Sequence, residues 1–174
     1  ISPKEVGGNI EIMGNVTGNN NIVSEVEDLF TVCELVEDWV QVGQDINGNI
    51  NCELLGWDVS LSDDGRTLAL SSLGDTIVIG YVEIYDFDEM TMLWNQRGQR
   101  ILGNIADDDF GISISLASNG NTVAIGGQVT NSVIDPGRVQ IFDYNGTSMM
   151  WEQRGQNIDG DTPIDSSNIV SMSN

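Results

Sequence analysis

The stretch 93–104, "LWNQRGQRILGN", contains a phrase that occurs three times in this chain. It reads Trp-x-Gln-x-Gly-Gln-x-Ile-x-Gly, appears first as "WVQVGQDING" from residue 39 and returns as "WEQRGQNIDG" from residue 151. The three tryptophans lie 55 and 57 residues apart. A period of this length predicts a tandem-repeat architecture.

Two columns of the repeat are interpreted as structural. A large indole ring fills the wedge between neighbouring sheets, and a glycine four positions later lets the chain turn toward the next unit. These positions are Trp39, Trp94 and Trp151 for the ring and Gly43, Gly98 and Gly155 for the turn.

Within one period the apolar residues alternate, which is typical of β-strands. "GWDVSLS" places Trp57, Val59 and Leu61 on one face. A turn follows, and in this unit and the next it has Gly65 or Gly120 at the position that requires a positive φ. Two further strands and the tryptophan strand complete the unit. Four short antiparallel strands with tight turns are typical of a propeller blade. We therefore predict an all-β chain of β-propeller-type blades of four antiparallel strands, about three repeat equivalents of roughly 56 residues, with no helix.

The repeat also predicts the domain boundaries. Residues 1–39 are a partial blade (strands two to four), 40–94 and 95–151 are full blades, and 152–174 begin the next. Propellers typically close with four to eight blades. Three alternatives stay open: two chains or tandem copies that close a six-bladed ring, a slice of a longer array, or an open stack with polymerising edges.

Composition excludes several classes of function. The net charge is −21, which argues against a nucleic-acid surface and against docking onto an anionic membrane. The chain has no histidine, so a His general base, a Ser-His-Asp triad and a His metal site are excluded within it. No apolar run approaches the ~18 residues of a membrane span, so no membrane insertion is predicted. Carboxylate pairs are abundant, but nothing distinguishes one pair, so we predict no enzymatic activity.

The N-terminus and the two cysteines bear on how the chain is processed. The chain opens "ISPKEVGG" without an initiator methionine or a signal peptide, so we interpret it as a mature or excised piece of something longer. Cys33 and Cys52 cannot make a zinc site alone. They form a disulfide in an oxidising compartment or are both free, and we favour the disulfide.

The repeat resembles two known families. The Trp-to-Gly phrase, followed by "DFGISISLASNGNTVAIGG" and "RVQIF", is similar to tandem repeats of large secreted or cell-surface proteins of diatoms and related algae. The Phe110-Gly111 and 124–126 "AIG" segments also resemble the FG-GAP repeat of integrin α-subunit propellers. The resemblance implies adhesion, surface coating or structural assembly. Integrin blades carry a D-x-D-x-D-G calcium loop, but the corresponding turns here lack the alternating carboxylates, so that site does not carry over.

An acidic run offers a different candidate metal site. Asp107, Asp108 and Asp109 precede "FGISIS" on one loop, and carboxylate oxygens are ligands for Ca²⁺. The alternative is a solvated acidic loop, because consecutive side chains point in different directions. Ca²⁺ is thus the one cofactor predicted.

Two sequons predict N-glycosylation, at Asn15 and at Asn145. Both are expected in loops. The second, in "DYNGTS", is equally explained as an Asn-Gly hairpin turn.

Arg97 and Arg154 occupy the same column of the repeat, where Val42 stands in the first unit. We expect each arginine to reach an acidic residue of the neighbouring blade. A sulfated or carboxylated polysaccharide is the alternative ligand.

These observations predict an extracellular or cell-surface structural and adhesive module. It would assemble through blade-to-blade and chain-to-chain packing, so its partners would be copies of itself or neighbouring repeats, with polysaccharide as a further candidate and no nucleic acid. The alternative function is a calcium- or glycan-binding cell-surface propeller domain.

Overall fold

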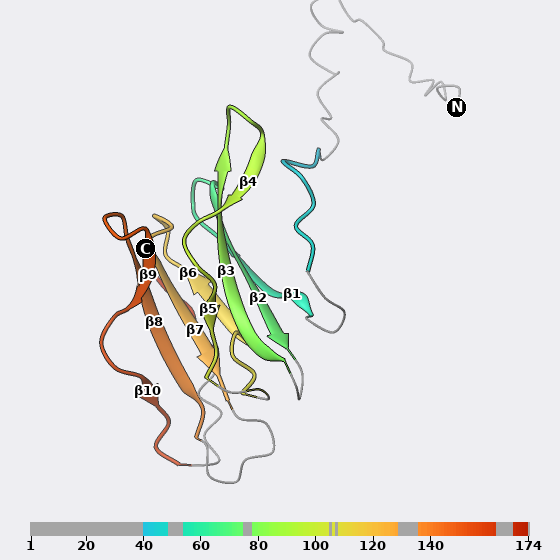
Figure 1. Ribbon diagram of the computed structural model, residues 1–174. Coiled ribbons are helices and arrows are strands. Elements are labelled where there is room, and N and C mark those ends of the chain that lie inside the picture. The colour runs from blue at the N-terminus through green and yellow to red at the C-terminus, as the bar shows by residue number, and fades with distance from the viewer. Residues whose placement is uncertain are drawn as a thin grey trace, which may run out of the picture. The chain divides into compact units, whose positions relative to one another are not determined.

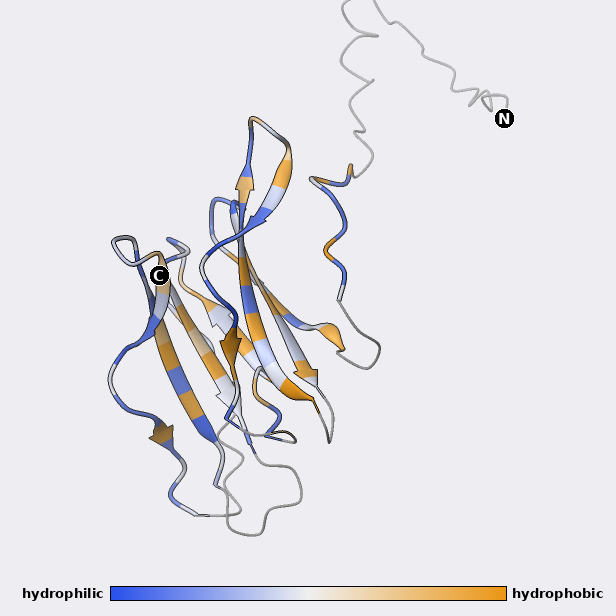
Figure 2. Ribbon diagram, viewed as in Figure 1, coloured by the Kyte–Doolittle hydropathy of each residue, from blue (hydrophilic) through white to orange (hydrophobic). Residues whose placement is uncertain are grey.

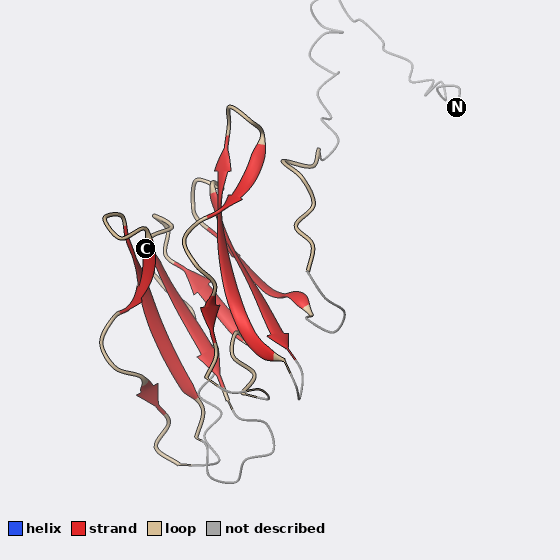
Figure 3. Ribbon diagram, in the orientation of Figure 1, coloured by secondary structure: helices blue, strands red, loops and turns tan. Residues whose placement is uncertain are grey.

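The computed structural model describes residues 40–48, 54–74, 78–104, 106, 108–128, 136–162 and 169–173. Across these ranges the chain forms ten strands and no helix, and the strands make two antiparallel sheets (Figures 1 and 3). The prediction of an all-β chain is confirmed. The described strands do not close into a propeller.

The first sheet is drawn in green in Figure 1 and has the order β1-β2-β3-β4, with β5 also paired to β3. Its strands are β1 Leu55–Leu61, β2 Thr67–Gly74, β3 Ile79–Asp88, β4 Leu93–Gln96 and β5 Ile101–Leu102. Tyr85 of β3 is paired with Gln96 of β4, whereas Tyr81 is paired with Leu102 of β5. Both β4 and β5 therefore pair with β3, one after the other along its length. They are two halves of one outer strand, which is bent between Gln96 and Ile101.

The second sheet repeats this arrangement in yellow and orange (Figure 1). Its order is β10-β8-β7-β6, and β9 also pairs with β8. The strands are β6 Ser113–Leu116, β7 Thr122–Gly127, β8 Arg138–Asn145, β9 Met150–Gln153 and β10 Ile158–Asp159. Trp94 and Trp151 lie on the equivalent strands β4 and β9, as the repeat predicted.

Turn chemistry explains the first hairpin of each sheet. Gly65 and Gly120 both have φ of 70°, a left-handed conformation that costs glycine little. Gly120 is also constrained by space, because a Cβ there would lie 2.6 Å from the Oγ1 atom of Thr67 in the other sheet. The predicted positive φ at both positions is confirmed.

The core lies between the two sheets. Apolar and polar residues alternate along β3 and β8, as the bands of Figure 2 show. The buried cluster takes residues from both sheets and from the loop between them: Ala69, Val82, Ile84, Ile101, Phe110, Ile114, Leu116, Val123, Ile125 and Trp151. Trp57, Val59 and Leu61 of β1 instead remain more than half exposed in the part of the chain that is described.

Side chains link the first strands of successive units. Asp58 Oδ2 accepts the backbone N–H of Ile114 at 2.7 Å, and Ser60 Oγ accepts that of Leu116 at 2.8 Å. One unit later the same positions of β6 repeat the contact, with Ser113 Oγ accepting from Val170 and Ser115 Oγ from Met172. Residues 169–173 therefore lie against β6 as β6 lies against β1.

Candidate functional site: the tryptophan joint between repeats

The repeated phrase forms a contact between units that we call the tryptophan joint. In its first copy, Gly43 has φ of 78°, and a Cβ built there would lie 2.6 Å from Cδ1 of Trp94. The indole Nε1–H donates to the carbonyl of Val42 at 3.0 Å. Glycine is required because only a bare backbone lets the ring approach this closely.

A glutamine completes the joint. The Nε2 amide of Gln44 donates to the Trp94 carbonyl at 2.8 Å, and its Oε1 accepts the Trp94 N–H at 2.8 Å. The side-chain amide offers one donor and one acceptor, so it pairs with the edge of β4 as another strand would. Gln44 and Trp94 are 50 residues apart, so this contact is tertiary.

The second copy has the same geometry. A Cβ on Gly98 would lie 2.9 Å from Cδ1 of Trp151, and the indole Nε1–H donates to the Arg97 carbonyl at 2.8 Å. Gln99 donates to the Trp151 carbonyl at 2.7 Å and accepts its N–H at 2.9 Å. Trp151 is only 3% exposed. The interpretation of these tryptophans and glycines as structural agrees with both contacts.

Arg97 extends the second joint. Its guanidinium lies 4.1 Å from the ring centroid of Tyr144, and it donates to the Gly120 carbonyl at 3.1 Å and to Asn121 Oδ1 at 2.5 Å. Its acidic contact, Asp86 at 3.4 Å, belongs to its own sheet. The expectation of an acidic partner on the neighbouring blade is therefore wrong for Arg97: the neighbour supplies a carbonyl, an amide and an aromatic ring.

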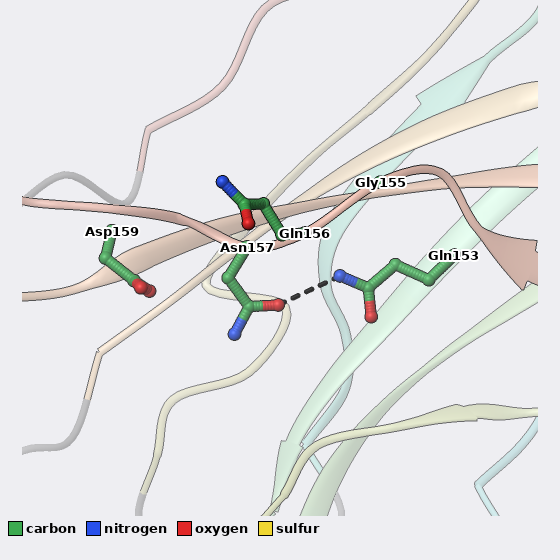
Figure 4. A pocket seen from close by; sticks show the side chains of 5 residues that line it. All are labelled: Gln153, Gly155, Gln156, Asn157 and Asp159. Atoms are coloured by element: carbon green, nitrogen blue, oxygen red, sulfur yellow. Dashed lines mark hydrogen bonds between the residues drawn. The ribbon is translucent and has the colours of Figure 1, made fainter.

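The glycine of the third copy has the same conformation as those of the first two, but no tryptophan of the described residues packs against it. Gly155 has φ of 71°, but no heavy atom of the described residues lies within 4 Å of a Cβ built on it. It lines an open depression with Gln153, Gln156, Asn157 and Asp159 (Figure 4). Gln153 Nε2 donates to Asn157 Oδ1 at 2.9 Å, and the Gln156 side chain takes no part in this hydrogen bond (Figure 4).

Arg154 in this third copy pairs within its own sheet. Its Nε donates to Asp143 Oδ2 at 2.5 Å, and its Nη2 donates to Oδ1 at 2.6 Å. Burial favours the neutral form of Asp143, but hydrogen bonds from Arg154 and Thr122 outweigh it and lower the pKa of the carboxyl. The pair carries modest energy because both side chains are partly exposed.

A buried glutamate in the first sheet, with an arginine and two tyrosines around it, was not predicted from the sequence. Glu83 of β3 is 4% exposed; it accepts from Arg100 Nε at 2.5 Å and from the Tyr85 hydroxyl at 2.8 Å. Arg100 also lies 4.1 Å from the Tyr81 ring centroid. Burial, followed by the hydrogen bond to Glu83, raises the pKa of Tyr85 well above its ordinary value. The alternation of "YVEIYDF" contained the signal, because it places a glutamate on a buried strand beside apolar neighbours.

The acidic loop uses a carboxylate to close itself. Asp108 is 6% exposed, and it accepts the backbone N–H of Phe110 at 3.2 Å and of Asn104 at 3.0 Å. Gly103 allows this approach, since a Cβ there would lie 2.8 Å from the carboxylate. Asp109 has φ of 42°, and Asp107 lies outside the described residues. No group of three or more His, Cys, Asp or Glu side chains able to hold a metal occurs within the described ranges. Calcium binding stays a prediction.

Of the two predicted glycosylation sites, only Asn145 lies within the described residues. Asn145 ends β8, and its Oδ1 accepts the N–H of Thr147 at 2.9 Å while its Nδ2 donates to Glu152 at 3.0 Å. This is the Asn-Gly turn that the sequence offered as the alternative to glycosylation. Asn15, Cys33, Cys52 and Trp39 lie outside the described residues.

Comparison with known proteins gives limited similarity. No family model and no curated protein matches the chain. One solved structure that is similar, from Bacteroides fragilis, is described as a "putative 6-phosphogluconolactonase". The two share 23% identity over 67% of this chain and 29% of that one, with a TM-score of 0.45. The chain therefore spans less than a third of that protein. Among the described residues, no helix is long and apolar enough to cross a membrane.

This comparison corrects the functional prediction. The similar protein is described as an enzyme, which contradicts both the extracellular adhesive module, with its calcium- or glycan-binding alternative, and the prediction of no enzymatic activity. At this identity and TM-score the likeness assigns no reaction to the present chain. The resemblance to algal and FG-GAP repeats stays a prediction, since no family model matches.

Proposed function

We propose that the two sheets are consecutive blades of a β-propeller, and that this segment forms part of the frame of such a protein. Its biochemical role is to bind one blade to the next through the tryptophan joint. The neighbouring repeat is therefore the partner that each unit recognises.

One observation supports this proposal above the others. The same contacts join successive units at two separate places: the tryptophan joint on the outer strands, and the Asp58–Ile114 type of hydrogen bond on the first strands. Each contact occurs twice with equivalent partners, so successive units are related by a repeated operation. A ring of four-stranded sheets is the arrangement that such repetition produces in propellers.

A matched pair of alanine variants tests the joint. Gly98→Ala and Gly155→Ala place alanine at nearly the same positive φ, 74° and 71°, so both carry a strain of roughly 1–2 kcal/mol. Only the first also meets a tryptophan, 2.9 Å from the new Cβ. Gly98→Ala should therefore lower the free energy of unfolding by about 1–3 kcal/mol more than Gly155→Ala.

The measurement is denaturant unfolding followed by tryptophan fluorescence. Gly98→Ala should also increase acrylamide quenching, because Trp151 loses its close contact, while Gly155→Ala leaves quenching unchanged. Equal destabilisation by the two variants would show that the joint does not hold the blades together, and would remove the proposed function.

A further inference from the structure

We infer that residues 154–156 are an open half-site that binds the tryptophan-bearing strand of another repeat unit. This inference rests on the proposed function and names its partner. The ligand is a β-strand whose tryptophan supplies an indole ring, an indole N–H and a backbone N–H and C=O pair.

The first support is that the half-site is complete in its own residues. The two occupied joints consist of a carbonyl at Val42 or Arg97, a glycine at positive φ and a glutamine directly after it. Residues 154–156 repeat this set as Arg154, Gly155 and Gln156, and the φ of Gly155 is within 7° of the other two glycines.

The second support is the open space where the indole would lie. A Cβ on the first two glycines meets a tryptophan Cδ1 at 2.6 and 2.9 Å, whereas nothing among the described residues lies within 4 Å of a Cβ on Gly155. The depression next to it is lined by amides and a carboxylate (Figure 4). Those groups match the polar edge of a strand better than they match an apolar ligand.

The third support comes from the residues around the half-site. Arg97 of the occupied joint contacts the turn and the aromatic ring of the following sheet. Arg154 is the equivalent residue, and it is already oriented by two hydrogen bonds to Asp143. Gln153 donates to Asn157 at 2.9 Å. The equivalent residues beside the first joint make the same hydrogen bond, from Gln41 to Asp45 at 2.8 Å.

The test uses the full chain labelled with ¹⁵N and an unlabelled peptide of residues 142–155, which carries Trp151 in its own hairpin. NMR titration should shift the backbone amide of Gly155 and the side-chain amide of Gln156. The amides of Gly98 and Gln99 should stay unchanged, because their joint is already occupied.

Two substitutions establish specificity. A peptide with Trp151→Ala should bind at least about tenfold more weakly, since it lacks the ring and the indole donor. In the protein, Gly155→Ala should weaken binding to a similar degree, because its Cβ occupies the place of the ring. Gly65→Ala is the matched control: Gly65 has nearly the same positive φ, 70°, and the nearest described atom to a Cβ built there is Leu61 Cδ2 at 3.9 Å, but it lies in the turn between β1 and β2, away from the phrase.

The outcomes separate this inference from the proposed function. No shift at Gly155 up to about 1 mM peptide, or equal shifts with the Trp151→Ala peptide, would overturn the half-site. That result would not affect the two occupied tryptophan joints, Trp94 with Gly43 and Trp151 with Gly98. The comparison of Gly98→Ala with Gly155→Ala tests those joints separately. Equal destabilisation in that comparison would instead remove the proposed function, whatever the peptide does.

Discussion

Equivalent residues of the two repeats share a backbone position but differ in chemistry. Glu83 and Gln140 are both buried on the third strand, yet Glu83 is charged and contacts Arg100, while Gln140 donates to Gln153 at 3.3 Å. The buried glutamate is stabilised because it has both a cation and a hydroxyl as partners. The first sheet thus carries a charged cluster where the second has two amides.

The Tyr85 hydroxyl provides a pH test of this cluster. Its folded-state pKa lies above its ordinary value of 10.0, so the stability it contributes is present below pH 10.0 and is lost as the pH rises further. The free energy of unfolding should therefore fall more steeply above about pH 10 in the wild type than in Tyr85→Phe.

Ultraviolet absorbance checks the assignment directly. Tyr85→Phe should remove a tyrosine whose pKa in the folded protein lies above its ordinary value. Glu83→Gln should bring the pKa of Tyr85 down toward its ordinary value, since it removes the carboxylate that accepts the phenol proton. An unchanged titration in Glu83→Gln would contradict the role given to Glu83.

At the scale of elements, side chains join strands that do not share a backbone ladder. β1 and β6 belong to different sheets, yet Asp58 and Ser60 accept backbone N–H groups of β6. The Gln44 and Gln99 amides act similarly on the outer strands β4 and β9. Pairing by side chains allows the sheets to remain separate while their edges stay satisfied.

Hydrogen exchange tests the link between β1 and β6. Ser60→Ala removes the acceptor of the Leu116 N–H, so exchange of this amide should accelerate and the free energy of unfolding should fall by about 1–3 kcal/mol. The Ile114 amide, held by Asp58, should keep its protection apart from that global loss.

Ser148→Ala is the control for this measurement. Ser148 lies on the exposed turn between β8 and β9, and its hydroxyl donates to Glu152 of the same sheet at 2.8 Å. This hydrogen bond does not join two sheets. Substitution of Ser148 should change the free energy of unfolding by no more than about 0.5 kcal/mol. Comparable effects of the two serine variants would rule out a special role for Ser60.

At the scale of the molecule, one core serves both sheets. Val82 and Ile84 of β3 belong to the same buried cluster as Val123 and Ile125 of β7. Neither sheet can bury its apolar face alone, so the two should unfold together.

Ile84→Ala tests this cooperativity. The cavity should lower the free energy of unfolding by about 2–5 kcal/mol, since Ile84 is fully buried. Circular dichroism and tryptophan fluorescence, to which Trp151 of the other sheet contributes, should report one coincident transition. Two separated transitions would show that each sheet is an independent unit.

Much of the local structure could be predicted because it depends on near neighbours. Alternation located the strands, and the turn glycines Gly65 and Gly120 were expected at positive φ. The tryptophan and glycine columns were interpreted as structural from their spacing of 55 and 57 residues along the chain. The partner of Arg97 was predicted wrongly, because sequence does not show which strand lies beside it.

The sequence by itself determined an all-β chain of repeated antiparallel units, because alternation, turn glycines and a repeated phrase are all local or periodic signals. Only the tertiary structure decided why the phrase is repeated. It brings Gly98 and Gln99 to a tryptophan more than 50 residues away, whereas none of the described residues comes within 4 Å of a Cβ built on Gly155. It also buries Glu83 against Arg100. Such contacts depend on how two sheets pack, and packing joins residues whose distance along the chain carries no information about their separation in space.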